Sequence, residues 1–273
     1  MCIYYHRKLI IKSFDRRNYY EKNISDFFIP SNSVYDITEN DYQRAEVLIN
    51  AAKAFARSTH KSVYIIDYFR KNFLYASESL AYICGGNKSK ILEYGYDIYI
   101  NNVPEYDQKM LLEVNEAGFN FFNNIPVEKR AEYTISYDFH IVNDGKKRLV
   151  NHTLTPMMMT EEGRIWLALC TFSPSPRKRT GYIRMHKNGE RIYHEYNLTS
   201  HSWEERQIPQ LTDMEHEVLR FSLQGYTMNE IAEKLCKSID SVKTYKRNLF
   251  ARLKVKNIAE AISYATTYRL FEK

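Results

Sequence analysis

The chain contains little glycine and proline. Of its 273 residues, 9 are Gly and 7 are Pro, 16 in all, which is about half of the roughly 12% that these two residues supply in an average protein. This scarcity excludes a collagen-like or low-complexity chain. It also predicts few long loops, because Gly and Pro are the residues that most often break regular structure.

Cysteine is also sparse and widely spaced. The four cysteines are Cys2, Cys84, Cys170 and Cys236. They form no CxxC pair and no Cys/His spacing of the kind that holds zinc, so we predict no metal site. The chain is too long and too poor in cysteine for a disulfide scaffold. Cys84, in the segment Tyr82–Gly86, is expected to be a small buried apolar residue.

Long apolar runs and enzyme motifs are absent from the sequence. Near the N-terminus the apolar run Leu9–Ile11 has three residues, too few for the core of a signal peptide. No stretch approaches the ~20 apolar residues of a membrane helix, so we predict a soluble, cytoplasmic protein. No P-loop, GxSxG, HExxH or kinase signature occurs. We therefore expect no enzyme and no catalytic residue.

Net charge is mild, but it is concentrated in one segment. Lys and Arg number 39 and Asp and Glu 33, which leaves +6. Residues 238–256 carry six basic side chains against Asp240 alone, or +5, and the remaining 254 residues sum to about +1. Those basic residues are Lys243, Lys246, Arg247, Arg252, Lys254 and Lys256. Positive charge gathered on one short segment is typical of a nucleic-acid contact.

The last 60 or so residues carry four helix-start signals. Thr212 and Thr227 each begin a capping box, and Ser238 and Asn257 are further N-caps. The four signals predict short helices over 213–224, 228–236, 239–254 and 258–271, with Gly225 ending the first of them. The tight connection Cys236–Ser238 between the second and third helices predicts a helix-turn-helix, in which the third helix reads DNA.

These residues resemble the LuxR/NarL-type DNA-binding domain. The resemblance is carried by Leu211-Thr212-Asp213-Met214-Glu215-His216-Glu217-Val218-Leu219, Gly225, Glu230-Ile231-Ala232, Leu235, Ser238, Ser241-Val242-Lys243, Leu253 and Val255. Two positions depart from the family pattern: Tyr245 stands where His is frequent, and Ser241 where Thr is frequent. Both side chains can still hydrogen-bond a phosphate. Region 4 of a sigma factor shares part of this pattern but lacks the Leu-x-Val ending and the fourth helix.

The resemblance implies roles for individual residues. Lys243, Thr244 and Arg247 would face base edges, where Lys and Arg suit guanine and the Thr methyl suits thymine. Four more residues would contact the DNA backbone or neighbouring groups: Ser241, Tyr245, Lys246 and Asn248. Thr227, at the start of the second helix, would bring backbone N–H groups to a phosphate.

The fourth helix resembles the family's dimer surface, through Ile258, Ala261, Ile262 and Ala265. The alternative is that these side chains pack against the first helix of the domain. The implied partners are double-stranded DNA, a second copy of the chain and, further, RNA polymerase.

Residues 61–173 have a different pattern, with elements in the order β-β-α-α-α-β-β-β. The strand segments are Ser62–Tyr68, Asn72–Ser77, Tyr133–Val142, Arg148–Met159 and Ile165–Phe172, and the helical segments are Glu78–Cys84, Lys88–Tyr94 and about 104–123. This order resembles a PAS domain, a five-stranded antiparallel sheet with helices over one face. The resemblance implies a module that senses a small molecule or a partner.

The segments that flank this module complete the predicted organisation. Residues 1–37 form an N-terminal arm without periodicity, and 38–60 form a helix capped by Thr38. Residues 174–209 are predicted to be a linker with a β-hairpin around Asn188-Gly189. With a helix-turn-helix domain over 210–273, the chain is α+β.

Candidate residues of a ligand pocket are Asp67, Tyr75, Tyr137 and Trp166. His140 and His152, on predicted strands, are expected to be surface or half-buried residues rather than haem ligands, so we predict no cofactor beyond an unknown small molecule. The sequence favours a DNA-binding transcriptional regulator. Two alternatives remain: a protein-interaction scaffold whose helical bundle only dimerises, and a haem or flavin redox sensor.

Overall fold

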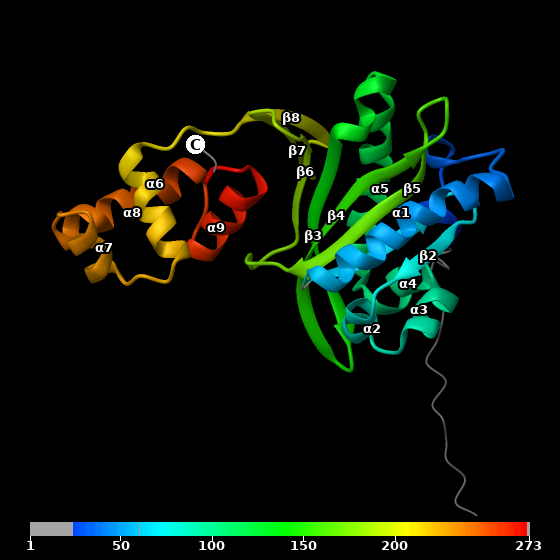
Figure 1. The fold of residues 1–273 in the computed structure, drawn as a ribbon, viewed down its shortest axis with the longest axis horizontal. Helices are drawn as coiled ribbons and strands as arrows, with labels where there is room; N and C mark the ends of the chain where they lie inside the picture. The colour runs from blue at the N-terminus through cyan, green and yellow to red at the C-terminus, as the bar shows by residue number, and fades with distance from the viewer. Residues whose placement is uncertain (1–23, 60, 272–273) are drawn as a thin grey trace, which may run out of the picture.

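The computed structural model describes residues 24–59 and 61–271 and contains one antiparallel sheet of eight strands, in the order β2-β1-β5-β4-β3-β6-β7-β8 (Figure 1). The strands are β1 (Ser62–Asp67), β2 (Asn72–Ala76), β3 (Tyr133–Asn143), β4 (Lys146–Met159), β5 (Ile165–Pro174), β6 (Gly181–Lys187), β7 (Ile192–Asn197) and β8 (Ser202–Gln207). A helical domain follows the last strand. The predicted α+β class is confirmed.

The first five strands and the helices between them form the PAS-like module that the element order predicted. The helices are α2 (Glu78–Cys84), α3 (Lys88–Tyr94), α4 (Asp97–Asn102) and α5 (Glu105–Asn123), with a 3-10 segment η3 (Val127–Glu132) before β3. The bounds of α2 and α3 are those predicted. The short helix α4 was not predicted, because its six residues are too few to show a helical period.

The sheet is larger than the sequence indicated. The hairpin of β6 and β7 was predicted as part of a linker, but β6 pairs with β3 from Tyr133 to Asp138 and extends the same sheet. The edge strand β8 was not predicted at all, because its sequence, Ser-Trp-Glu-Glu-Arg-Gln, is polar and mostly charged. A polar edge is consistent with a strand that has water on one side.

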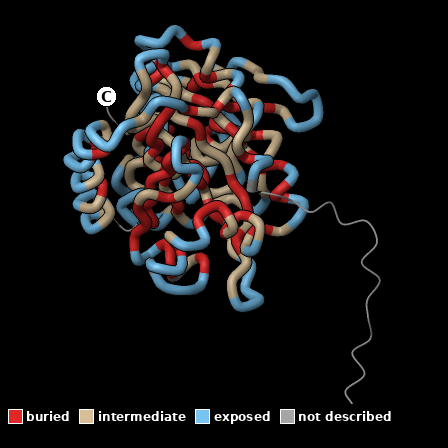
Figure 2. Tube along the Cα trace, turned by 90° about the vertical axis from the view of Figure 1, so that its right-hand side faces the viewer, coloured by how far each residue is buried: buried red, intermediate tan, exposed pale blue. Residues whose placement is uncertain are grey.

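The two faces of the sheet have different covers. Helices α2 to α5 pack on one face, called here the inner face, where the hydroxyl of Tyr64 meets that of Tyr99 in α4. Helix α1 (Glu39–Ser58) lies across the opposite, outer face, where the hydroxyl of Tyr42 donates to Asp67 at 2.5 Å. Figure 2 shows the buried segments gathered in the interior and the exposed ones around them. The buried pattern of β1, in which all six residues are buried, follows from this double cover.

Part of the expected N-terminal arm is folded onto the PAS-like module. Residues 24–32 contain two 3-10 turns, η1 (Ile24–Phe27) and η2 (Pro30–Asn32), and Phe27 and Val34 are buried in the main core. Two amides of α5 hold this segment, since Asn115 donates to the Phe27 carbonyl at 3.0 Å and Asn123 to that of Ser31 at 2.9 Å. The prediction of an arm is therefore wrong for residues 24–37, and residues 1–23 lie outside the described part.

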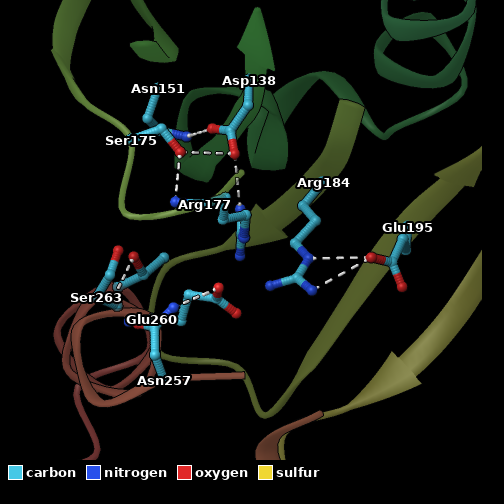
Figure 3. Close-up of polar contacts among 10 residues, drawn as sticks. Asp138, Asn151, Ser175, Arg177, Arg184, Glu195, Asn257, Glu260 and Ser263 are labelled. Atoms are coloured by element: carbon cyan, nitrogen blue, oxygen red, sulfur yellow. Dashed lines mark hydrogen bonds and ion pairs between the residues drawn. The ribbon is translucent and has the colours of Figure 1, made fainter. Parts of the chain in front are cut away.

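The crossing from β5 to β6 is fixed by a buried ion pair. The chain passes over β4 and β3, and Arg177 reaches the carboxylate of Asp138 in β3 at 3.2 Å (Figure 3). Asp138 is fully buried, and it also accepts hydrogen bonds from Asn151 at 2.6 Å and from Ser175 at 3.1 Å. Burial raises the pKa of Asp138, and Arg177 opposes that rise. The segment predicted as a linker is thus anchored to the sheet.

The C-terminal domain has four helices that begin at the predicted caps. They are α6 (Asp213–Leu223), α7 (Met228–Lys234), α8 (Ile239–Leu253) and α9 (Ile258–Thr267). The side chains of Thr212, Thr227, Ser238 and Asn257 each accept a backbone N–H three residues on. Gly225, with φ +85°, follows the end of α6, as predicted. These local bonds explain why the four helix starts are readable from the sequence alone.

Candidate functional site

Helix α8 presents one polar face to solvent and one apolar face to the domain. Val242, Leu249 and Leu253 are buried against the other helices of the domain. The exposed side chains on the opposite face are Asp240, Lys243, Thr244, Arg247 and Asn248. Spacings of three and four residues bring them together on a single stripe. The predicted reading residues are therefore side by side and accessible, and the tight α7–α8 connection gives helix-turn-helix geometry.

The positive charge of this region is not all available to a partner. Arg252 is engaged with the buried carboxylate of Glu215 in α6 at 2.9 Å, so it ties α8 to α6. Lys243 lies 3.0 Å from Asp240, but both side chains are well exposed, and such a surface pair is weak. A phosphate or a guanine edge can displace it. Arg247 is exposed and lies at the centre of the stripe.

Three of the residues expected at the DNA backbone are partly buried. Tyr245 packs against the small core of Val218, Ile231, Ala232 and Val242, so its ring stabilises the α6–α7–α8 packing. Ser241 shares a hydrogen bond of 2.9 Å with Ser238 at the start of α8. The amine of Lys246 lies 5.8 Å from the centre of the Phe250 ring. Of the four residues, Asn248 is the one that is exposed.

Thr227 uses its polar groups within its own helix. Its backbone N–H and its hydroxyl each donate to the carboxylate of Glu230 at 2.7 Å, and this bonding lowers the pKa of Glu230. The capping box therefore occupies the Thr227 donors that a phosphate would need. A phosphate would have to use the amides of Met228 and Asn229 in the first turn.

Helix α9 is joined to the outer face of the sheet. Tyr193 of β7 belongs to the same buried cluster as Tyr264 and Ala265 of α9. The guanidinium of Arg184 in β6 is held by Glu195 at 3.2 Å (Figure 3). It lies 5.0 Å from the ring centre of Tyr193 and 5.6 Å from that of Tyr264. The DNA-binding helices thus share a core with the sheet extension of the PAS-like module.

The four residues predicted to form a dimer surface fall into two pairs. Ala261 and Ala265 are fully buried in the core that α9 forms with Leu219, Leu249 and Leu253. This is the alternative packing against the first helix of the domain. Ile258 and Ile262 are partly exposed beside that core. A second copy could reach only the latter pair in this arrangement.

The PAS-like module contains two small neighbouring cavities on the inner side of its sheet. Their volumes are about 40 and 30 Å³. They share the lining residues Asn115, Tyr137 and Leu154. A cavity needs about 10–15 Å³ to hold one water molecule, so each has room for two or three. Aromatic and aliphatic side chains line most of both, which suits a small and largely apolar occupant.

His152 is the most distinctive polar group of the second cavity. It is 1% exposed, which makes the expectation of a surface or half-buried residue wrong. Its Nε2 shares a hydrogen bond of 2.7 Å with the hydroxyl of Tyr64, and its Nδ1 is buried without a partner among the described residues. Burial lowers the pKa of His152 to about 3, so the ring is neutral near pH 7. It can offer one hydrogen bond to an occupant.

Of the four predicted pocket residues, one lines the cavities. Tyr137 lines both. Asp67 and Trp166 lie on the outer face against Tyr42 of α1, and Tyr75 pairs with Ile65, so it faces the same side. His152 was missed, although it alternates with Val150 and Leu154 along β4, which marks it as an inner-face residue. Cys84 is buried, as predicted.

Within residues 24–59 and 61–271, no group of three or more His, Cys, Asp or Glu side chains is arranged to hold a metal ion. None of the helices in the same part of the chain combines the length and hydrophobicity needed to cross a membrane.

Comparisons with known proteins agree with this arrangement at the C-terminus. Residues 209–265 match the family model of the luxR family of bacterial regulatory proteins, so α6 to α9 form a LuxR-type helix-turn-helix domain. No curated protein sequence matches the chain.

Solved structures with similarity to the chain include three relevant examples. The phage VqmA–DPO complex is 14% identical, with a TM-score of 0.29, over 85% of this chain and 92% of that one. The Vibrio cholerae VqmA dimer without target DNA is 14% identical, with a TM-score of 0.33, over 82% of this chain and 88% of that one. A PAS domain from Colwellia psychrerythraea is 16% identical, with a TM-score of 0.35, over 48% and 99%.

Proposed function

We propose that this chain is a cytoplasmic, DNA-binding transcriptional regulator in which a PAS-like module senses a small molecule and controls a LuxR-type helix-turn-helix. The observation that carries the proposal is the exposed polar face of α8, with Lys243, Thr244 and Arg247 side by side, in a domain that matches a family of bacterial regulators. A face of this composition suits guanine and thymine edges in the major groove.

The sensing role is supported by the inner-side cavities. The lining is mainly apolar, with the polar residues Asn115 and Tyr137 common to both cavities and the neutral His152 ring in the second. This arrangement favours a small uncharged molecule with one or two hydrogen-bonding atoms. A charged ligand would lose its hydration without gaining an opposite charge.

The sheet extension supplies the connection between the two modules. Met185 of β6 lines the larger cavity, while its neighbour Arg184 faces Tyr264 of α9 on the outer face. An occupant that moves β6 would therefore change the position of α9. In a dimer, that motion would alter the separation of the two recognition helices and hence the fit to paired half-sites.

DNA binding is tested by selecting duplexes from a pool with a randomised 20-bp core and measuring their affinity by fluorescence anisotropy over a series of KCl concentrations. We expect affinity to fall steeply with salt, because phosphate contacts release counterions. Arg247→Ala and Lys243→Ala should each weaken specific binding by about 1–3 kcal/mol.

A matched control is Lys109→Ala, which removes an exposed lysine from α5 of the PAS-like module and should leave affinity unchanged. A double variant of Lys243 and Arg247 that binds selected DNA as tightly as the unaltered protein would contradict the assignment of α8. Failure to bind any duplex at low salt would instead favour a scaffold whose helical domain only associates with protein.

A further inference from the structure

Helix α1 leaves an apolar stripe exposed on its outward side. Val47 is 74% exposed, Leu48 39% and Phe55 42%. The opposite side of the same helix is buried on the sheet through Tyr42, Ala45 and Ala52. Single exposed apolar residues are ordinary on a protein surface, but a continuous apolar stripe marks a contact site.

The stripe has the spacing of a helix-packing surface. Val47, Ala51 and Ala54 follow one another at intervals of four and three residues, and Leu48 and Phe55 continue the stripe along one edge. Ala51 and Ala54 are exposed and small, so another helix can approach closely at the middle of α1. The larger side chains lie toward the two ends of the stripe, where they can fill the space beside a crossing helix.

The stripe is complementary to itself when one copy is reversed. A two-fold axis through Ala51 places Val47 of one copy opposite Phe55 of the other, because the two positions lie four residues on either side of the axis. The same operation brings Glu46 of one copy level, within one residue, with Arg57 of the other. Both charged residues are exposed and flank the stripe on the same side.

These two charges have no ion-pair partner within the described part of the chain. The structure pairs Asp41 with Arg44 and Glu39 with Arg70, whereas Glu46 and Arg57 form no ion pair among residues 24–59 and 61–271. In an antiparallel arrangement, each copy would supply one Glu46 and one Arg57, which gives two identical ion pairs about the axis. A parallel two-fold arrangement would place the two copies of Glu46 on opposite sides of the contact and about 11 residues along the helix from Arg57, so it would form neither ion pair.

We infer that α1 is the interface through which two copies of this chain associate, antiparallel about Ala51. Such a contact is isologous, with the same patch on both subunits, and so closes as a dimer. One helix pair covers less surface than the ~1,200–2,000 Å² of a standard stable interface. We therefore expect a weak dimer, which does not require DNA.

A cysteine at the axis tests the geometry in the full-length protein. In a background of Cys2→Ser and Cys236→Ser, with the buried Cys84 and Cys170 left in place, Ala51→Cys should form an intermolecular disulfide under mild oxidation. The matched control is Gln43→Cys, exposed on the same helix. Its two copies would be about 24 Å apart along the helix axis at 1.5 Å per residue, too far for a disulfide.

Crosslinking through Gln43→Cys as efficient as through Ala51→Cys would overturn the antiparallel arrangement. Absence of crosslinking at Ala51→Cys at concentrations of tens of micromolar would overturn the interface itself. Crosslinking that appears only after residues 1–23 are removed would also overturn it, since the stripe would then belong to that segment of the same chain.

Sedimentation equilibrium without DNA tests the chemistry of the contact. Val47→Glu, at a position too exposed to affect folding, should raise the dissociation constant at least tenfold while far-UV circular dichroism stays unchanged. Glu46→Arg and Arg57→Glu should each raise it several-fold, and the double exchange should restore it. Single variants without effect, or a double variant as weak as either single one, would contradict the pairing of Glu46 with Arg57.

Discussion

The two modules of this chain are stabilised in different ways. The PAS-like module has a single core that spans its five strands and four helices and continues into α1, β6 and β7, and it buries polar side chains such as Asp138 and His152 completely. The helix-turn-helix domain has two small clusters, and one of them is completed by Tyr193 and Ile208 from outside its helices. Its four helices instead begin with local caps.

This difference decides how far the effect of one residue extends. Asp138 and Arg177 are partners from separate segments of the chain, so loss of Arg177 leaves a buried charge inside the sheet. The partner of a cap is three residues away, so its loss affects one helix end.

The two modules can be followed separately by spectroscopy. Trp166 and Trp203, the only tryptophans, lie in β5 and β8, so tryptophan fluorescence reports on the sheet. Circular dichroism also reports on the helices of the other domain.

The largest expected effect is the loss of the buried ion pair. Arg177→Ala should lower the free energy of unfolding of the PAS-like module by about 3–5 kcal/mol, because it leaves the carboxylate of Asp138 buried and unpaired. The pKa of Asp138, already raised by burial, should rise further without Arg177. Urea unfolding followed by tryptophan fluorescence measures the change.

Arg179, two residues further along the same crossing segment, is exposed and provides the matched control, since Arg179→Ala should have little effect. Adding Asp138→Asn to Arg177→Ala should recover part of the loss, because the unpaired charge is then gone. If the double variant is as unstable as Arg177→Ala alone, packing rather than charge accounts for the effect.

The next effect is a pH dependence that belongs to the PAS-like module. His152 has a pKa lowered by burial to about 3, whereas an unfolded histidine titrates near 6.5. As pH falls below that value, the unfolded chain takes up a proton that the folded chain does not. Stability is therefore lost as pH falls, by about 2 kcal/mol between pH 7 and pH 5.

His152→Gln should flatten this dependence, measured as urea unfolding at pH 7 and pH 5 with tryptophan fluorescence. His201, exposed in the loop between β7 and β8, gives a comparison variant, His201→Gln, that should keep most of the loss. An unchanged slope in His152→Gln would mean that another group controls the acid response.

The same contrast explains what the sequence could predict. Helix starts at Thr212, Thr227 and Ser238 depend on hydrogen bonds to residues three positions away, so the starts of these helices could be predicted to the residue. Their ends could not, since the predicted ends at 236 and 271 lie beyond the observed ends at Lys234 and Thr267. Strands β1 to β5 could be predicted from alternation and turn residues. The pairing of β6 with β3 could not, because strand partners distant in sequence are chosen by packing.

The same difference between local signals and long-range packing decided which site residues could be predicted. The stripe on α8 was predictable because helical spacing fixes which side chains share a face. The lining of the cavities was not predictable. Asp67 and Tyr137 are both polar residues on strands, and only the positions of α1 and α5 decide which face of the sheet contains a cavity. His152 was within reach of the sequence, since it shares a strand face with Val150 and Leu154, but its polar character favoured the surface.

The smallest expected effect compares one capping box in each module. Thr227→Ala at α7 and Thr38→Ala at α1 remove the same hydroxyl, and each side chain accepts the N–H of the third residue of its helix. A lost N-cap costs about 1 kcal/mol. In α1, which has 20 residues and lies on the sheet, the loss should be confined to fraying of the first turn.

In α7, which has seven residues, the first turn is more than half of the helix and positions the connection to α8. Thr227→Ala should therefore weaken DNA binding several-fold and shift the unfolding transition seen by circular dichroism but not by fluorescence. Thr38→Ala should do neither. Equal losses of DNA affinity in the two variants would show that the helix-turn-helix depends on the sheet as much as on its own caps, and the contrast between local and long-range stabilisation would not hold.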